Sequence, residues 1–126
     1  MSKALIGVID DDDALCSSVV DLMRSVGHRA QPFHSVEAFL ASPDQVLFHC
    51  LVADVQLPGM SPVDLVRQLR QQSNPIPIIL MTARPNRDLE QAARAAGAAC
   101  ILTKPFDAAV LLDWVEKSLT STLRGQ

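Results

Sequence analysis

The sequence predicts an α/β fold in which helices cover both faces of a doubly wound, five-stranded parallel sheet. Short apolar runs of the length of a buried strand alternate along the chain with stretches whose apolar residues recur at helical spacing. Neither a repeat nor a low-complexity segment interrupts this alternation. Successive strand–helix units favour a parallel sheet, because right-handed crossover connections place helices on both of its faces.

Size and composition favour one soluble domain spanning residues 1–126. The chain has 126 residues, of which 48% are hydrophobic and 20% charged, as in an ordinary globular protein. No apolar stretch approaches the roughly 20 residues that cross a bilayer, and the first residues lack a signal-peptide pattern. We therefore expect a cytoplasmic protein without membrane contact. The net charge of −3 provides no basic surface, so this domain should not bind nucleic acid directly.

The first unit begins with the apolar strand Leu5–Ile9 and continues with a helix that starts within Asp12 and Asp13. Aspartates at that place cap free N–H groups and complement the positive end of the helix dipole. Gly27 ends the helix, as a glycine after the last turn commonly does. The apolar stripe of this helix comprises Leu15, Val19, Leu22, Met23 and Val26.

The second unit has a weak strand around Arg29–Phe33 and a short helix capped by Ser35. Pro32 indicates that this strand lies at a sheet edge, where a missing N–H group is tolerated. The third unit has a strand that ends at Asp54, a turn at Leu57-Pro58-Gly59, and a helix that ends in the polar run 71–74. The inward-facing positions of the two helices are Val36, Phe39, Leu40, Val63, Leu65, Val66 and Leu69.

The fourth strand starts at Ile76-Pro77-Ile78 and runs into Thr82, and the helix Arg87–Ala96 follows and is closed by Gly97. The fifth strand covers about residues 99–103. The last helix starts near Asp107, and the tail 120–126 is expected to fray. Its apolar positions are Val110, Leu111, Leu112, Trp114, Val115 and Leu119.

Cysteines and histidines are scattered and suggest no site of their own. Cys16, Cys50 and Cys100 show no C-x-x-C spacing, so we expect small buried residues rather than a disulfide or a metal site. The histidines are unclustered and are expected at the surface or in loops; they are His28, His34 and His49.

Chemically active side chains follow several of the strands directly. Asp10 and Asp11 follow the first strand, Asp54 ends the third, Thr82 ends the fourth, and Lys104 follows the fifth. Parallel strands bind ligands at their carboxyl ends, so these groups should meet at one edge of the sheet. Two carboxylates about 4 Å apart repel by roughly 4 kcal/mol at an effective dielectric near 20. A cation should therefore offset the repulsion, either Lys104 or a divalent ion with oxygen ligands such as Mg²⁺.

A family resemblance is carried by the segments Val8-Ile9-Asp10-Asp11-Asp12, the run from Asp54 to Ser61, Met81-Thr82-Ala83, and Ala96-Gly97-Ala98 through Thr103-Lys104-Pro105-Phe106. Together these segments resemble the receiver domain of two-component response regulators, and the resemblance covers almost the whole chain in the correct order. The strand order implied is 2-1-3-4-5, a flavodoxin-like (βα)5 arrangement with a crevice between the first and third strands. A finer similarity, to receivers that precede a LuxR-type helix-turn-helix output domain, includes Gly27-His28 and the segment from Phe33 to Leu40.

The resemblance implies that Asp54 is a nucleophile that accepts a phosphoryl group from a sensor histidine kinase or a phosphotransfer protein. It implies a Mg²⁺ cofactor held by Asp11, a carboxylate oxygen of Asp54 and the backbone carbonyl of Gln56, while Asp10 acts through water or by positioning. Such a domain is not an enzyme beyond catalysing its own phosphorylation and dephosphorylation. Phosphoryl transfer depends mostly on positioning and on neutralising the charge of the oxygens.

The resemblance also implies a switch that carries the signal away from the site. Lys104 pairs with the phosphoryl oxygens, the Thr82 hydroxyl hydrogen-bonds to one of them, and the Lys104-Pro105 peptide is expected to be cis. The output surface is the helix Arg87–Ala96, the strand at 99–103 and the last helix, which would bind a partner or form a homodimer and so regulate transcription. Ile101 stands where the family usually has an aromatic switch residue, and Arg84 stands two residues after Thr82, where hydrolysis is often tuned.

Three other functions remain open at this point. A haloacid-dehalogenase-type phosphatase also uses an aspartate at a strand end, but it needs a second aspartate where Gln56 stands. A degenerate, non-phosphorylated interaction module would not need Asp11, Asp54, Thr82 and Lys104 together. A nucleotide-binding domain is disfavoured because neither G-x-G-x-x-G nor G-x-x-x-x-G-K-[ST] occurs.

Overall fold

The computed structural model describes residues 4–57 and 59–123, with side chains to residue 120. Within these residues, five parallel strands form a sheet in the order β2-β1-β3-β4-β5. This result confirms both the predicted fold class and the strand order 2-1-3-4-5. The strands are β1 (Leu5–Ile9), β2 (Arg29–Phe33), β3 (Cys50–Asp54), β4 (Ile78–Thr82) and β5 (Cys100–Thr103).

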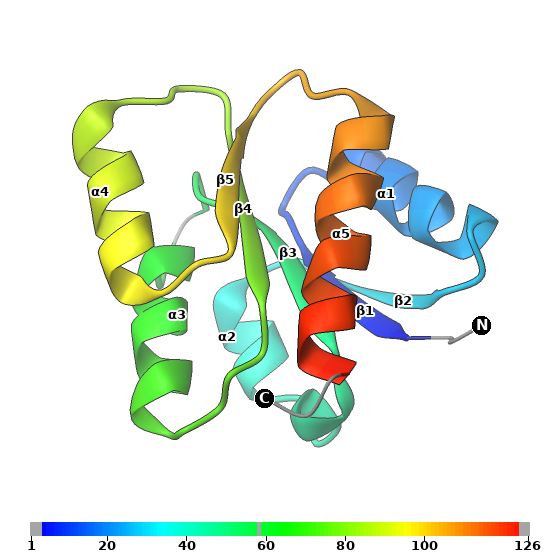
Figure 1. Cartoon of the computed structure of the whole chain (residues 1–126), viewed down its shortest axis with the longest axis horizontal. Coiled ribbons are helices and arrows are strands. Elements are labelled where there is room, and N and C mark those ends of the chain that lie inside the picture. Colours follow the sequence, from blue (N-terminus) through cyan, green and yellow to red (C-terminus); the bar gives the residue numbers. More distant parts are fainter. Residues whose placement is uncertain (1–3, 58, 124–126) are drawn as a thin grey trace.

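Helices cover both faces of this sheet (Figure 1). The helices are α1 (Asp13–Ser25), α2 (Val36–Leu40), the short 3-10 helix η1 (Gln45–Leu47), α3 (Pro62–Gln71), α4 (Arg87–Ala96) and α5 (Ala108–Leu123). Buried residues of α1 and α5 form one core with the sheet, and those of α2, α3 and α4 form a second core on the opposite face. The molecule is therefore a three-layered sandwich.

The sheet residues divide between these two cores with the period of two that strands impose. In β3, Cys50 and Val52 belong to the core under α1 and α5, whereas Leu51 and Ala53 belong to the core under α2, α3 and α4. All five residues of β3 are buried. This burial on both faces explains why the central strands read as continuous apolar runs.

Parallel register brings the strand ends to a common level. Ile9 of β1 pairs with Ala53 of β3, so the residues that follow them, Asp10 and Asp54, stand side by side. Thr82 ends β4 and pairs with Thr103 of β5, directly before Lys104. The fold therefore brings four chemically active residues to one edge of the sheet, namely Asp10, Asp54, Thr82 and Lys104.

The helix caps agree with the sequence prediction. Asp12 caps α1 by accepting the Leu15 N–H group, and Ser35 caps α2 by accepting the Ala38 N–H group. Gly97 closes α4 with φ +104°, a left-handed conformation that favours glycine.

Two predicted core positions are wrong. Val26 is 46% exposed because α1 has already ended at Ser25, so its side chain no longer follows the apolar stripe. Val110 is 43% exposed because the buried stripe of α5 is formed by residues spaced four apart, Leu111, Val115 and Leu119, and Val110 lies one residue out of that phase.

The predicted fraying of the tail is also wrong for its first part. Helix α5 continues to Leu123, and the Thr120 hydroxyl donates a hydrogen bond to the Glu116 carbonyl at 2.9 Å. Buried Leu119 anchors this turn on the sheet. Residues 124–126 lie outside the described part of the chain.

His28 lies in the loop between α1 and β2, which agrees with the prediction of a surface or loop residue, and its side chain is buried. Its Nδ1 atom accepts the Ala4 N–H group at 3.3 Å, so Nε2 is the nitrogen that donates toward Glu116 Oε2 at 2.7 Å. The ring thereby links the start of β1 to α5. His49 likewise accepts the Leu5 N–H group at 3.0 Å, whereas His34 is exposed beside Asp13.

The cysteines are free, and Cys16 and Cys50 are buried as predicted, while Cys100 is half-buried. Burial raises the pKa of the Cys50 and Cys100 thiols to about 12, which leaves them unreactive.

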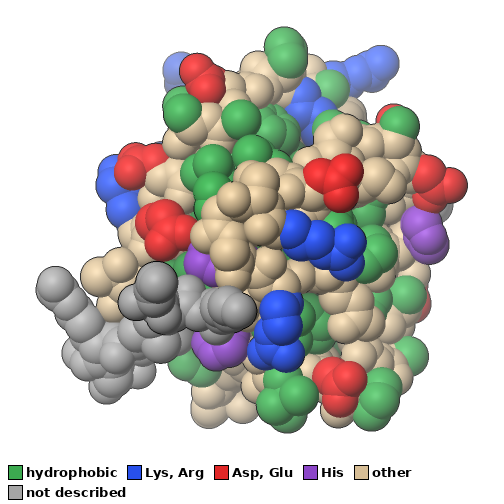
Figure 2. Space-filling view, turned by 90° about the vertical axis from the view of Figure 1, so that its right-hand side faces the viewer, with side chains coloured by type: hydrophobic (Ala, Val, Ile, Leu, Met, Phe, Trp, Pro, Cys, Tyr) green, Lys and Arg blue, Asp and Glu red, His purple; other side chains and the backbone are tan. Residues whose placement is uncertain are grey.

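On the face drawn in Figure 2, acidic and basic side chains are interspersed among apolar ones. Among the described residues, no helix has both the length and the apolar character to span a membrane.

Candidate functional site

Asp10 stands directly after β1 and is fully buried. Its backbone N–H group donates to the Phe33 carbonyl at 3.0 Å, which fixes the chain between β1 and β2. Its Oδ1 atom accepts the Asp12 N–H group at 3.0 Å, whereas its Oδ2 atom is buried without a hydrogen-bond partner. Burial raises the pKa of Asp10, and it outweighs the lowering by the Asp12 N–H group and by Lys104.

Asp54 is the last residue of β3 and is only 6% exposed. One carboxylate oxygen, Oδ1, accepts the N–H group of Gln56 at 3.0 Å. The other, Oδ2, lies 2.9 Å from the ammonium nitrogen of Lys104. The Gln56 N–H group and the Lys104 ammonium group therefore hold the Asp54 carboxylate in one orientation at this edge of the sheet.

Lys104 reaches this carboxylate from the loop after β5. Its backbone N–H group donates to the Thr82 carbonyl at 2.7 Å, and the Lys104-Pro105 peptide is cis, as predicted. Its ammonium nitrogen also lies 3.7 Å from Asp10 Oδ2, within reach of an ion pair but too far for a hydrogen bond. One cation thus serves two buried carboxylates.

The carboxylates outnumber this cation. Asp10, Asp11 and Asp54 each place a carboxylate oxygen within 4.8 Å of the others, and Asp11 is exposed. The unpartnered Asp10 oxygen and the excess negative charge both fit a small divalent cation with oxygen ligands. The residues present therefore suit the divalent cation that the sequence predicts at this edge.

Thr82 ends β4 and is 1% exposed. Its hydroxyl oxygen accepts the Arg84 N–H group at 3.0 Å, which leaves the hydroxyl proton available to donate. Gln56 is exposed at the start of the loop after β3. Ile101 is half-buried in β5 and packs against the core under α2, α3 and α4.

The structure thus brings Asp10, Asp11, Asp54 and Lys104 together, with the Thr82 backbone joined to Lys104. The sequence reasoning missed Glu37, which accepts the Met60 N–H group in the loop after β3 at 2.9 Å. The two residues are 23 positions apart, and no local pattern joins them.

Comparison with known proteins adds independent evidence. Residues 6–116 match the family model described as the response regulator receiver domain. The chain is 34% identical over 118 residues to the transcriptional regulatory protein FixJ of Bradyrhizobium diazoefficiens, a match that covers 94% of this chain and 58% of FixJ. It is 35% identical over 117 residues to the response regulator protein TmoT of Ectopseudomonas mendocina, covering 93% of this chain and 53% of TmoT. The chain spans little more than half the length of these relatives.

Solved structures give the same result. Full-length FixJ from B. japonicum superposes with a TM-score of 0.86 at 33% identity, covering 95% of this chain and 59% of that one. The BeF3-activated DrrB receiver domain superposes with a TM-score of 0.84 at 30% identity, covering 94% of this chain and 99% of that one.

Proposed function

Because this chain belongs to the response regulator receiver family of two-component signalling, we propose that Asp54 is the residue that accepts the phosphoryl group. The observation that carries this assignment is the contact of 2.9 Å between Asp54 Oδ2 and the Lys104 ammonium group, at the edge where β1 and β3 end. A buried carboxylate beside a cation, with two further carboxylates within 4.8 Å, suits a nucleophile that must receive a phosphoryl group.

The transfer follows from the chain's own groups. An Asp54 carboxylate oxygen attacks the phosphorus of a phosphohistidine on a sensor kinase or phosphotransfer protein, forming an O–P bond as the P–N bond breaks, and the departing imidazole takes up a proton. Lys104, freed from Asp54 Oδ2, pairs with the phosphoryl oxygens. The Thr82 hydroxyl donates its proton to one of them while it still accepts the Arg84 N–H group.

The carboxylates of Asp11 and Asp54 and the backbone carbonyl of Gln56 would hold Mg²⁺, with Asp10 acting through water. When bound, the ion neutralises charge on the phosphoryl oxygens. Asp10 supports this arrangement because its buried Oδ2 atom has no hydrogen-bond partner.

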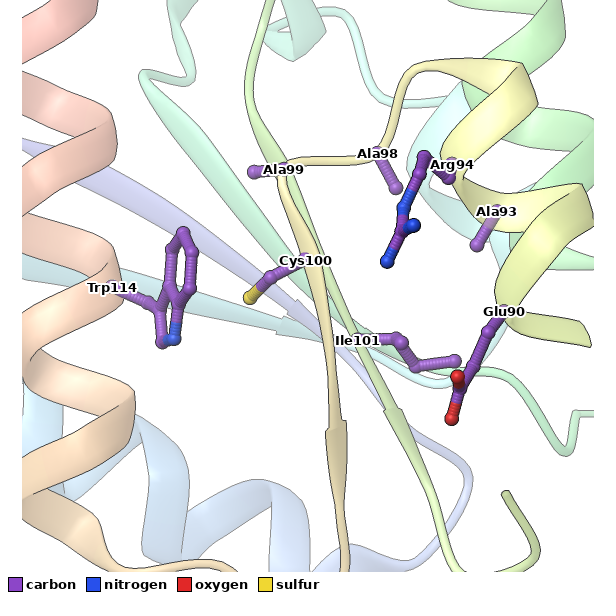
Figure 3. A pocket seen from close by; sticks show the side chains of 8 residues that line it. All are labelled: Glu90, Ala93, Arg94, Ala98, Ala99, Cys100, Ile101 and Trp114. Atoms are coloured by element: carbon purple, nitrogen blue, oxygen red, sulfur yellow. The ribbon is translucent and has the colours of Figure 1, made fainter. Parts of the chain in front are cut away.

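The output surface that we propose is the face of α4, β5 and α5. A hollow of about 310 Å³ lies there, and Figure 3 shows Ile101 directed toward α4 and Glu90, while Cys100 is directed toward Trp114 of α5. Phosphorylation would draw Thr82 inward and let Ile101 move, which alters this face for self-association or for a partner. Isoleucine is short and stiff at χ1, so the two states differ little and coupling is weak.

We further propose that residues 1–126 act as one cytoplasmic receiver domain whose partners are a sensor kinase and a transcriptional output. The names of FixJ and TmoT support the regulatory role.

Incubation with Mg²⁺ and acetyl phosphate tests the central assignment. Intact-mass analysis should show one added phosphoryl group in the parent protein and none in Asp54→Asn. A parent protein that stays unmodified, under conditions that label another receiver, would instead support a non-phosphorylated interaction module.

A further inference from the structure

The carboxylate of Glu37, on α2, reaches across to the loop that joins β3 to α3. Its Oε2 atom accepts the Met60 N–H group at 2.9 Å, and that hydrogen bond lowers the pKa of Glu37. A Cβ atom at Gly59 would lie 2.7 Å from the same oxygen, and Gly59 has φ +81°. A Cβ atom there would have to displace the Glu37 carboxylate, and the left-handed φ favours glycine at this position.

Helix α2 holds the backbone of Glu37 in a fixed position, although the helix is only five residues long. Val36 and Phe39 are buried at 0% and 1% exposure, and Ser35 caps the helix. The Phe39 ring packs edge-on against Phe33 and Phe48, with centroids 5.4 and 5.5 Å away. The buried residues before and after Glu37 in the chain, Val36 and Phe39, thus fix its backbone on the core.

The loop that Glu37 contacts carries Gln56, whose backbone carbonyl is a proposed ligand of the divalent ion. At its start, the Gln56 N–H group is bound to Asp54 Oδ1, and at its end Ser61 caps α3. Among the described residues between 57 and 60, the Met60 N–H group joins this loop to another element through its hydrogen bond to Glu37. It is placed to restrict the loop before any ion binds.

We propose that Glu37 is a positioning residue for the phosphorylation site, which acts by holding the loop after β3 in the conformation that presents the Gln56 carbonyl. The inference rests on the proposed function, because it needs that carbonyl as a ligand. Mg²⁺ demands near-ideal octahedral geometry, so a loop that must first be ordered weakens its binding. Loss of residues that orient metal ligands commonly costs about 10- to 100-fold in affinity, and for one loop tether we expect roughly three- to tenfold.

The test compares Mg²⁺ affinity in the parent protein, Glu37→Ala and Glu37→Gln, measured from melting temperature against Mg²⁺ concentration. The alanine variant should bind Mg²⁺ roughly three- to tenfold more weakly, while glutamine, which loses the charge but keeps an oxygen acceptor, should stay within about twofold. Asp88→Ala is the matched control, since Asp88 is also an exposed acid in the first turn of a helix. Amide exchange at Met60 should be faster in metal-free Glu37→Ala than in the parent.

A second readout separates positioning from general destabilisation. The acetyl phosphate reaction of Glu37→Ala should be slow at low Mg²⁺ and should recover at saturating Mg²⁺. Gly59→Ala, which displaces the carboxylate, should weaken Mg²⁺ binding in the same direction. If Mg²⁺ binds the parent and the alanine variant equally, Glu37 has no positioning role and the proposed function stands. If glutamine is as weak as alanine, the hydrogen bond is not the cause. A parent protein that binds no Mg²⁺ overturns both.

Discussion

Replacement of Asp10 by asparagine should make the metal-free protein more stable at neutral pH. The Asp10 carboxylate is fully buried, and its Oδ2 atom lacks a hydrogen-bond partner. Asparagine has nearly the same shape, and its Oδ1 atom can still accept the Asp12 N–H group that Asp10 accepts at 3.0 Å. The substitution therefore removes a charge while keeping the local hydrogen bond.

The magnitude follows from three opposing effects. Repulsion from Asp54, which has a carboxylate oxygen within 4.8 Å, is at least about 3.5 kcal/mol at an effective dielectric near 20, and attraction to Lys104 at 3.7 Å is about 4.5 kcal/mol. These nearly cancel, so the cost of burying the charge decides the sign. We expect Asp10→Asn to add about 1–2 kcal/mol to the free energy of unfolding, which corresponds to a rise of roughly 3–8 °C in Tm.

This gain should depend on pH in one direction. The folded-state pKa of Asp10 is raised above its ordinary value of 3.8, so the native state holds this proton more tightly than the unfolded state. The Asp10 carboxylate therefore costs stability above its folded pKa, and the cost disappears as pH falls toward the unfolded value. The advantage of asparagine should therefore be larger at pH 7 than near pH 4.

Urea unfolding in EDTA at pH 7 and near pH 4 provides the measurement. Mg²⁺ should reduce the advantage at pH 7, because the ion offsets the charge that asparagine removes. An asparagine variant no more stable than the parent at pH 7, or a gain that is the same at both pH values, would refute the reasoning.

Three further outcomes are expected. Mg²⁺ at ten times its dissociation constant should stabilise the parent by about 1.4 kcal/mol in melting experiments, and an equal shift in Asp54→Asn would contradict the metal assignment. Lys104→Ala should retain Mg²⁺ binding but lose most labelling by acetyl phosphate in intact-mass analysis, because the ammonium group acts on the phosphoryl oxygens; unchanged labelling would exclude that role. Ile101→Tyr should dimerise more strongly than the parent when sedimentation is measured with beryllofluoride, and a full parental response unaffected by tyrosine would argue against weak coupling.

The site could be predicted from the sequence to the extent that strand ends determine it. Asp54 and Thr82 end apolar runs, while Asp10 and Lys104 follow them, and parallel register then brings them to one level. Hydrophobic periodicity does not predict how the side chains are oriented at that edge. The unpartnered Oδ2 atom of Asp10 depends on the Asp12 N–H group binding the other oxygen, and only the folded loop shows this.

Contacts between distant residues account for two further features that the sequence did not predict. The Nε2 atom of buried His28 contacts Glu116, which lies 88 positions later in the chain. Glu37 reads as an ordinary exposed residue in the first turn of a helix, yet it binds Met60. Both partners are brought close by packing of separate units on the sheet, which no window of local sequence contains.

The charge of the site explains why a cation and a phosphoryl group should favour one another. When Asp10 is ionised, three carboxylates and one ammonium group leave the metal-free edge with an excess of negative charge. The proposed phosphorylation would replace the Asp54 carboxylate by a group of about −1.5 to −2, which would increase that excess. A divalent cation more than offsets the increase. The coupling would be reciprocal, so a phosphoryl group that strengthens Mg²⁺ binding would itself be stabilised by Mg²⁺ to the same extent. The charge of Asp10 makes the metal-free site costly, because its buried Oδ2 atom has no hydrogen-bond partner and only an ion pair of 3.7 Å with Lys104.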